Sequence, residues 1–221
     1  IELRLTAHYS EDPILLHAYT HDEDIHSRTA AEIFDIGIDE VTKDQRTVAK
    51  PINFGIIYGI GPGKLAETLD VPVEEAKHYI DMYLTRYAGV ADFIKKYQDL
   101  AKRHGFVRNY FGRVRHLDFL KSRHIEQWQR ERGYRQAVNF VIQSSAADMF
   151  KIIMRRCHDL LQGKRSTMVM NIHDEIVFYI HESEIDLLIP IKDAFENWSF
   201  KVPILAEISY STVSWGAKQA L

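Results

Sequence analysis

Apolar residues at helical spacing run through most of the chain before Leu161. An amphipathic helix places such residues three and four positions apart, on the face that packs against the core. Acidic residues before Pro13 mark one helix start, and Thr42 with Gln45 three residues later resembles a capping box. The pattern predicts helices from about Pro13 and over residues 24–34, 42–59, 70–87, 90–105 and 123–161, the last either continuous or broken.

Strand patterns lie near both ends of the chain. Residues 1–8 alternate apolar and polar, which is the period of a strand with one buried face. Residues 106–117 suggest a hairpin, and strands are predicted at 167–172, 176–180 and 204–210, with a helix at 182–198. Helices followed by strands predict an α+β fold in which a small antiparallel sheet gathers the two chain ends. Because a domain seldom begins inside a strand, we expect further residues upstream.

The composition fits a globular protein, since 46% of the residues are hydrophobic. A single cysteine, Cys157, excludes a disulfide framework and a thiolate metal cluster, which favours a reducing intracellular compartment such as the cytoplasm. No apolar run approaches the length of a membrane span, so no membrane partner is expected.

Charge is distributed unevenly, although the formal net charge is only −3. Residues 102–135 contain ten Lys or Arg and three acidic residues, and residues 174–207 contain eight Asp or Glu and two Lys. The first region suits a polyanion and the start of the second suits cations. Two oppositely charged solvated faces would give the same pattern.

Three consecutive polar residues, His173, Asp174 and Glu175, interrupt the apolar stretch between Val169 and Ile180. If residues 167–180 form a tight hairpin, the two carboxylates lie at its turn, where a divalent cation could reach them. The alternative is a solvated acidic turn, which is the commoner origin of such a triplet.

Arg46, Lys50, Phe54 and Tyr58 recur every four residues in the helix predicted at 42–59. Four residues advance about 400° at 3.6 residues per turn, so the four side chains line one face. Two cations followed by two aromatic rings match the phosphates and the base of a nucleoside triphosphate. In the alternative, the rings lie in the core and the cations extend to solvent.

Arg135, Asn139 and Gln143 show the same spacing on a helix that is otherwise largely apolar. Such a polar stripe must find hydrogen-bond partners. They could be a neighbouring helix, or the acceptors that every base pair presents in the minor groove of DNA.

These segments resemble family A DNA polymerases, the bacterial DNA polymerase I type. The opening "IELR", "QRTVAKPINFGIIYG" (45–59) and "NIHDEIVFYI" (171–180) are similar to motifs A, B and C of that family, in the same order. "DIHSRTAAEIF", "FGRVRH" and "NFVIQSSAADMFK" resemble its intervening segments. The resemblance covers essentially the whole chain and implies the fingers and most of the palm of a right-hand polymerase without its thumb.

The resemblance also implies a division of the chain. Residues 1–8 would be a palm strand, 9–120 the fingers with the motif B helix 42–59, and 121–221 the palm with the motif C hairpin 167–180. In this arrangement the helical fingers are inserted in a small antiparallel palm sheet.

Individual roles follow from the resemblance. Asp174 would be a catalytic carboxylate and a ligand of a site for two Mg²⁺ ions, with Glu175 as a supporting catalytic residue. The residues that would bind the incoming deoxynucleoside triphosphate are Glu2, His26, Arg46, Lys50, Phe54 and Tyr58. Those that would contact primer–template DNA are Arg135, Asn139, Gln143 and His173.

Two departures from the family pattern matter. Motif A of the family reads Asp-Tyr-Ser-Gln-Ile-Glu-Leu-Arg, and this chain begins at the Ile. Because that Asp is the other metal ligand, we expect the chain to need a second polypeptide that supplies the thumb, the upstream palm and the Asp. The second departure is Pro51 inside the motif B helix, which predicts a kink.

The leading hypothesis is therefore the C-terminal part of a DNA polymerase, inactive by itself. Two alternatives remain: a DNA-binding or scaffolding subunit without catalysis, and a single-subunit RNA polymerase. The bulk of Glu2 beside the sugar would count against the RNA polymerase.

Overall fold

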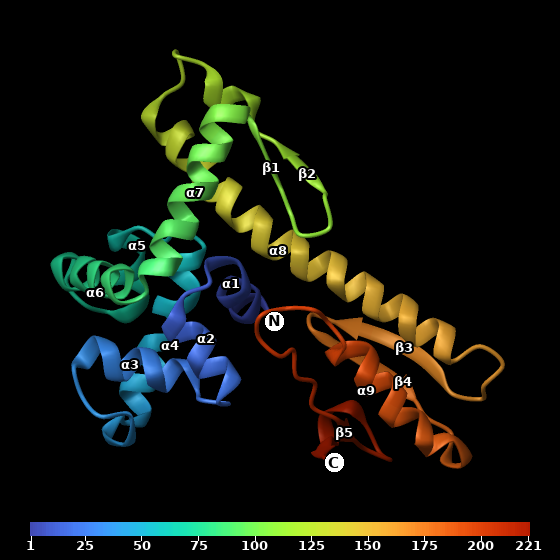
Figure 1. Cartoon of the computed structure of the whole chain (residues 1–221). Coiled ribbons are helices and arrows are strands. Elements are labelled where there is room, and N and C mark those ends of the chain that lie inside the picture. Colours follow the sequence, from blue (N-terminus) through green and yellow to red (C-terminus); the bar gives the residue numbers. More distant parts are fainter. The chain divides into compact units, whose positions relative to one another are not determined.

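Helices form most of the chain before Leu161 in the computed structural model, which describes residues 1–221 (Figure 1). They are α1 (Glu2–Ser10), α2 (Pro13–Thr20), α3 (Ile25–Phe34), α4 (Lys43–Ile57), α5 (Pro62–Leu69), α6 (Val73–Arg86), α7 (Ala88–His104) and α8 (Gln127–Leu160), with 3₁₀ turns η1 (Ile38–Glu40) and η2 (Asp118–Lys121). The later elements are strands β3 (Thr167–Ile172) and β4 (Glu175–Tyr179), the 3₁₀ segment η3 (Glu182–Leu187), α9 (Leu188–Glu196), β5 (Ser209–Tyr210), η4 (Trp215–Ala217) and β6 (Gln219–Ala220). Strands β1 (Phe106–Arg108) and β2 (Val114–His116) form the internal hairpin. The predicted α+β class is confirmed.

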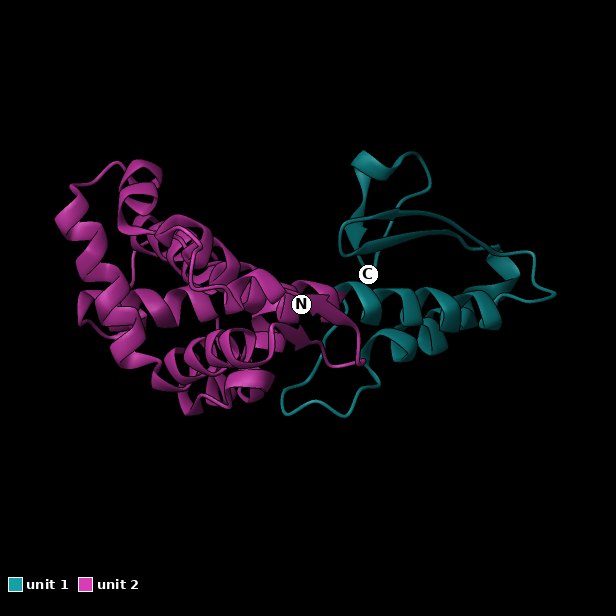
Figure 2. Ribbon diagram, turned by 90° about the horizontal axis from the view of Figure 1, so that it is seen from above, with its two compact units in different colours: residues 1, 147–221 teal, residues 2–146 magenta.

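The chain divides into two units, which Figure 2 colours separately. Unit 1 contains Ile1 and residues 147–221, and unit 2 contains residues 2–146. The long helix α8 supplies its first part to unit 2 and its last part to unit 1.

The strand predicted for residues 1–8 is wrong, because Glu2–Ser10 forms helix α1. Leu3, Leu5, Thr6 and Ala7 are all buried there. Alternation over eight residues is also compatible with helical spacing, since Leu3 lies three and four positions from Thr6 and Ala7. So short a segment does not separate the two periods.

The strands form three separate antiparallel pairs, β1–β2, β3–β4 and β5–β6. The expectation of one sheet that gathers both chain ends is therefore wrong. Of the strand predicted at 204–210, only Ser209–Tyr210 pairs, with Gln219–Ala220. The helix predicted at 182–198 is divided, because Glu184 has non-helical backbone angles. Helix α5 was not predicted.

Helix α4 begins where the capping box predicts. Thr42 Oγ1 accepts a hydrogen bond from the Gln45 backbone N–H, and Gln45 Oε1 accepts one from the Thr42 backbone N–H. The helix continues through Pro51 to Ile57. Pro51 has no N–H with which to bond the Thr47 carbonyl, which is the physical reason for expecting a kink there. The kink itself stays a prediction.

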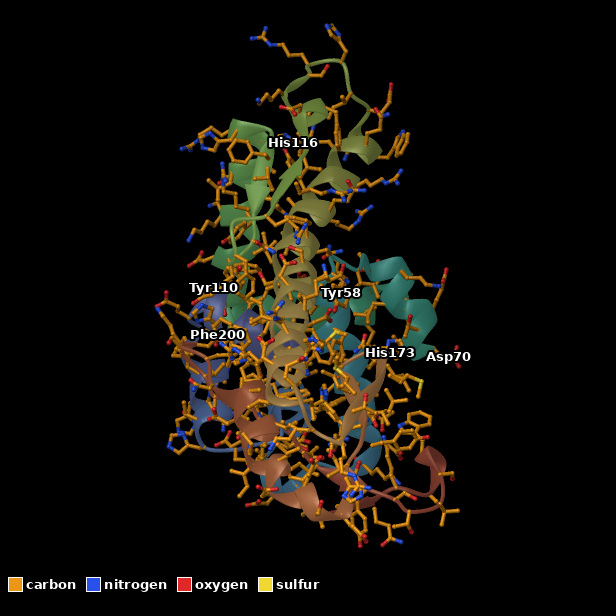
Figure 3. All side chains as sticks on the ribbon, turned by 90° about the vertical axis from the view of Figure 1, so that its right-hand side faces the viewer. Tyr58, Asp70, Tyr110, His116, His173 and Phe200 are labelled. Carbon is orange, nitrogen blue, oxygen red and sulfur yellow. The ribbon has the colours of Figure 1, made fainter.

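In unit 2, Ser145 on α8 joins three elements. Its Oγ lies 2.8 Å from the Tyr9 hydroxyl of α1, accepts the Tyr110 backbone N–H at 3.1 Å and donates to the Val141 carbonyl at 2.6 Å. Tyr110 belongs to the turn of the β1–β2 hairpin (Figure 3). This contact fixes α1 and the hairpin against the same part of α8.

In unit 1, the last turns of α8 pack against α9 and the segment that follows it. Arg156 Nη1 donates to the carbonyls of Ala194 and Asn197, and its guanidinium lies 4.4 Å from the centre of the Trp198 ring. Phe150 and Phe195 stack edge to face.

None of the helices combines the length and the apolar character that a membrane span requires.

Asp12 joins the starts of two helices in unit 2. Its Oδ1 accepts the backbone N–H groups of Ile14 and Leu15 at 3.0 and 3.2 Å, and its Oδ2 accepts that of Gly89 at 2.9 Å. The side chain is buried, with 1% exposure. Gly89 is required by this approach, because a Cβ there would lie 2.7 Å from Asp12 Cα.

We expect Asp12→Ala to lower the free energy of unfolding by about 3 kcal/mol, because it removes a helix cap and leaves buried N–H groups without acceptors. Urea denaturation measures this change. The control is Asp81→Ala on the exposed face of α6, which should change stability by less than about 0.5 kcal/mol. Equal effects of the two substitutions would contradict the assignment.

Candidate functional site

The motif B stripe consists of Arg46, Lys50, Phe54 and Tyr58. The first three lie at successive turns of α4, and Tyr58 is its C-terminal cap. Lys50 is exposed, and its ammonium makes no ion pair. The Phe54 ring is 38% exposed, whereas Ile52 and Asn53 beside it are fully buried. The alternative in which the ring of Phe54 belongs to the core is therefore wrong, and this face of α4 presents a cation and an aromatic ring to solvent.

Arg46 makes a two-point ion pair with Asp24, the N-cap of α3. Its Nε and Nη2 atoms lie 3.2 and 2.6 Å from the two carboxylate oxygens. Partial burial of Asp24 opposes ionisation, but hydrogen bonds from Arg46 and the Ser27 backbone N–H outweigh it and lower the pKa of Asp24 to about 2. The guanidinium of Arg46 is thus held in a two-point pair with a carboxylate.

This ion pair predicts a pH dependence of stability. The pKa of Asp24 is lower in the folded chain, about 2, than its ordinary value of 3.8. The stability that it contributes is therefore present above pH 4 and is lost as the pH falls toward 2. Because both side chains are partly exposed, solvent screening keeps this contribution small.

We expect Asp24→Asn to flatten this part of the stability profile, measured by urea denaturation between pH 5 and pH 2. Asn keeps the ability to cap α3, so the comparison isolates the charge. Asp24→Ala should add a loss of about 1 kcal/mol at every pH, because it also removes the cap. An unchanged slope in Asp24→Asn would show that the ion pair is not formed in solution.

His26 lies in the first turn of α3, beside the stripe. Its ring centre is 5.9 Å from that of Phe54, and its Nδ1 is 3.2 Å from Asn53 Nδ2. Burial lowers the pKa of His26, Asp24 opposes this effect, and the positive charges of Arg46 and Lys50 reinforce it. The structure therefore brings together His26, Arg46, Lys50 and Phe54, four of the six residues implied for nucleotide binding.

The polar stripe of α8 meets the end of α4 within unit 2. Asn139 Nδ2 donates to the Tyr58 carbonyl at 3.3 Å, and its Oδ1 is buried without a hydrogen-bond partner. Gly59 has φ +71°, and a Cβ there would lie 2.5 Å from Arg135 Cγ, so glycine permits this approach. Figure 3 shows Tyr58 where α4 reaches α8. Arg135 and Gln143 remain exposed.

Glu2 is the first residue of α1, and its side chain is half-buried. Helix α1 contacts α4. This contact attaches the segment that carries Glu2 to the helix that carries the motif B stripe.

The motif C residues occupy a two-residue turn in unit 1. Ile172 pairs with Glu175, so His173 and Asp174 form the tip, with His173 in the left-handed region at φ 54° (Figure 3). Asn171 Nδ2 supports the turn by donating to the carbonyl of Glu175 at 3.3 Å. Asp174 is exposed, and its carboxylate makes no hydrogen bond or ion pair.

Glu175 is held by the C-terminal segment. Lys218 Nζ lies 2.6 Å from Oε2, and Trp215 Nε1 donates to Oε1 at 2.7 Å. The hydrogen bond from Lys218 has the largest effect in lowering the pKa of Glu175, and the one from Trp215 adds to it. The two adjacent carboxylates therefore differ, because one is satisfied within the chain and the other is available to a ligand.

The donor set fits part of a magnesium site. Mg²⁺ prefers carboxylate oxygens and is often bound by one or two carboxylates together with substrate phosphates. The exposed carboxylate of Asp174 is one such group, and nowhere in residues 1–221 do three His, Cys, Asp or Glu side chains form a cluster that could hold a metal. If a metal ion binds at this turn, Asp174 would be a partial donor set and not a complete cage.

Several residues of these clusters were not singled out from the sequence. In unit 2 these are Asp24, Asn53 and Gly59, and in unit 1 they are Trp215 and Lys218; each contacts a cluster residue that is distant along the chain. Only Asp24 carried a local signal, since an acidic residue before a helix is a typical N-cap.

Comparison with known proteins shows the family of the chain. The sequence profile described as DNA polymerase family A matches residues 1–217. DNA polymerase I of Deinococcus radiodurans is 36% identical over 212 residues, covering 94% of this chain and 22% of the relative. DNA polymerase I of Caldicellulosiruptor bescii is 37% identical over 214 residues, covering 94% of this chain and 25% of the relative. The chain thus spans about a quarter of the length of these relatives.

A solved structure shares the fold. The POL domain of Pol1 from M. smegmatis, in complex with DNA primer-template and dNTP, superposes with a TM-score of 0.86 at 35% identity. The match covers 92% of this chain and 36% of the other. The predicted polymerase fold is confirmed, and the chain belongs to DNA polymerase family A.

Proposed function

We propose that this chain provides the nucleotide-binding and part of the metal-binding machinery of a template-directed DNA polymerase, which adds deoxynucleotides to a primer 3′ end. The observation that carries the proposal is the surface where Arg46, Lys50 and the exposed ring of Phe54 on α4 lie beside His26 on α3. Cations next to a stackable ring suit a deoxynucleoside triphosphate. The M. smegmatis neighbour was solved with such a ligand and with primer–template DNA.

In the proposed enzyme, Arg46, Lys50 and His26 hold the triphosphate, and Phe54 and Tyr58 border its base and sugar. Glu2 restricts the space beside the sugar. Arg135, Asn139 and Gln143 contact the minor groove of the primer–template, where exposed Arg135 and Gln143 offer hydrogen-bond donors. In the proposed division, residues 9–120 are fingers, and residues 1–8 and 121–221 belong to the palm.

Asp174, supported by Glu175, is the proposed metal-binding carboxylate, with His173 near the primer terminus. Two bound Mg²⁺ ions would supply charge stabilisation for phosphoryl transfer. The residues of the chain then act by orienting the triphosphate and the primer end.

We further propose that activity requires a second polypeptide or segment that supplies the thumb, the upstream palm and another carboxylate. One metal-binding carboxylate is a small donor set for two cations.

Primer extension with Mg²⁺ and deoxynucleotides tests the proposal, with the chain alone and then mixed with a polypeptide that carries the upstream half of a family A polymerase domain. We expect extension only in the mixture. Extension by the chain alone would overturn the requirement for a second part. Binding of primer–template without extension in either case would favour the scaffolding alternative.

A further inference from the structure

Behind His26 lies a line of buried polar side chains that the proposed nucleotide site does not use. Asn53 Nδ2 is 3.2 Å from His26 Nδ1, Asn53 Oδ1 accepts the Thr29 hydroxyl at 3.0 Å, and Thr29 Oγ1 is 3.0 Å from the Tyr87 hydroxyl. Asn53, Thr29 and Tyr87 are each fully buried, with 0% exposure. Polar groups removed from water in this way are costly unless every bond is made.

The partners fix the direction of each hydrogen bond. Asn53 Nδ2 also lies 3.0 Å from the Ala49 carbonyl, which can only accept, so the amide N–H₂ group must face it. Oδ1 then faces Thr29, whose hydroxyl donates to it. Since Thr29 has one hydroxyl proton, Tyr87 is the donor between these two.

This order leaves one role for His26 Nδ1. An N–H of Asn53 points at it, so Nδ1 must accept and carries no proton. The imidazole is then neutral, and its proton is on Nε2. Protonation of Nδ1 would set two donors against each other and break the bond to Asn53.

We propose that Asn53 is a positioning residue, which holds His26 as the neutral Nε2–H tautomer so that this N–H donates to a phosphate oxygen of the bound nucleotide. The inference rests on the proposed function for the identity of the ligand. The proton assignment is independent of that function and depends only on the buried contacts.

The charges around His26 are consistent with a neutral donor. Arg46 and Lys50 on α4 are the cations that act on the ring, and Asp24 before α3 is the anion. Asp24 is already paired with Arg46. A third positive charge would therefore be opposed by Lys50, whereas a neutral N–H adds a directed hydrogen bond without that repulsion.

The first test is long-range ¹H–¹⁵N NMR of the histidine rings in the 221-residue chain, between pH 8 and pH 5. For His26 we expect an unprotonated Nδ1 and a protonated Nε2, with a pKa below the ordinary histidine value. A protonated Nδ1 in the unmodified chain would overturn the proposal without the need for any variant.

The matched variants are Asn53→Ala, Tyr87→Phe and Tyr83→Phe. In Asn53→Ala we expect both neutral tautomers and a His26 pKa closer to the ordinary value. Tyr83 and Tyr87 are fully buried neighbours with ring centres 4.6 Å apart, but the Tyr83 hydroxyl has no hydrogen-bond partner. We therefore expect Tyr87→Phe to shift the His26 signals and Tyr83→Phe to leave them unchanged. Equal responses to the two Phe variants would count against the network.

The second test measures binding of a deoxynucleoside triphosphate with Mg²⁺ to the chain mixed with its upstream part and primer–template. We expect Asn53→Ala to weaken binding about tenfold at pH 7.5, because part of a hydrogen bond to a charged group is lost. Unchanged binding, with an altered tautomer, would overturn the role of Asn53 in positioning. If the unmodified mixture bound no nucleotide, the proposed function would fail, while the NMR result would still decide the tautomer.

Discussion

Replacing Asp174 by Asn is expected to reduce primer extension by the complemented chain about a thousandfold or more, where the complemented chain is the chain mixed with a polypeptide that carries the upstream half of the polymerase domain. The reason is that a catalytic metal ligand contributes several kcal/mol to the stabilisation of charge. The carboxylate stands at the tip of the β3–β4 hairpin and makes no bond within the chain. The substitution keeps its shape and removes its charge, so the fold should not change. Steady-state extension rates over a range of Mg²⁺ concentrations measure the effect.

The matched control is Glu175→Gln at the neighbouring position. Trp215 and Lys218 already satisfy the Glu175 carboxylate, so it is less available to a metal ion. We expect a smaller loss, about tenfold, which reflects weaker support of the turn. If Glu175→Gln removed activity as completely as Asp174→Asn, the proposed difference between the two carboxylates would be wrong.

Helices that bury one regular face could be predicted from the sequence because the signal repeats over several turns. Helices α3, α4, α6 and α7 begin and end close to the predicted residues, and the caps of α2 and α4 were visible as short motifs. Helix α5 has only eight residues, and it begins at Pro62 with Gly61 as its N-cap, a Gly-Pro pair that is typical of a turn. The strand prediction for residues 1–8 failed for a related reason, because so short a segment does not distinguish a period of two residues from a period of 3.6.

Residues on one face of one helix could likewise be grouped from spacing alone. The stripe from Arg46 to Tyr58 and the stripe from Arg135 to Gln143 were identified in this way. Contacts between helices could not be, because they depend on packing. Asp24 reaches Arg46 across 22 positions, and Tyr58 meets Asn139 across 81. The resemblance to a family supplied the expected roles, but not these partners.

The ion pair between Asp24 and Arg46 changes how the cations of the site should be compared. The charge of Arg46 is largely compensated by Asp24, whereas Lys50 has no anionic partner within the chain. A triphosphate that approaches this surface therefore meets Lys50 as an uncompensated cation. It must share Arg46 with Asp24 or displace it.

We therefore expect Lys50→Met to lower kcat/KM for the incoming deoxynucleotide about a hundredfold, a loss typical of removing one preorganised positive or hydrogen-bonding group from a developing charge. Single-nucleotide extension by the complemented chain measures this loss, and binding of primer–template should remain unchanged.

Lys77→Met, at an exposed position on α6, removes an equal charge away from this surface and should leave kcat/KM within a factor of about two. A loss that is equal in both variants, or that disappears at high salt, would mean that Lys50 acts only through the overall charge of the protein. A loss confined to Lys50 would identify its ammonium as a direct contact of the triphosphate, because screening weakens long-range attraction far more than a close pair.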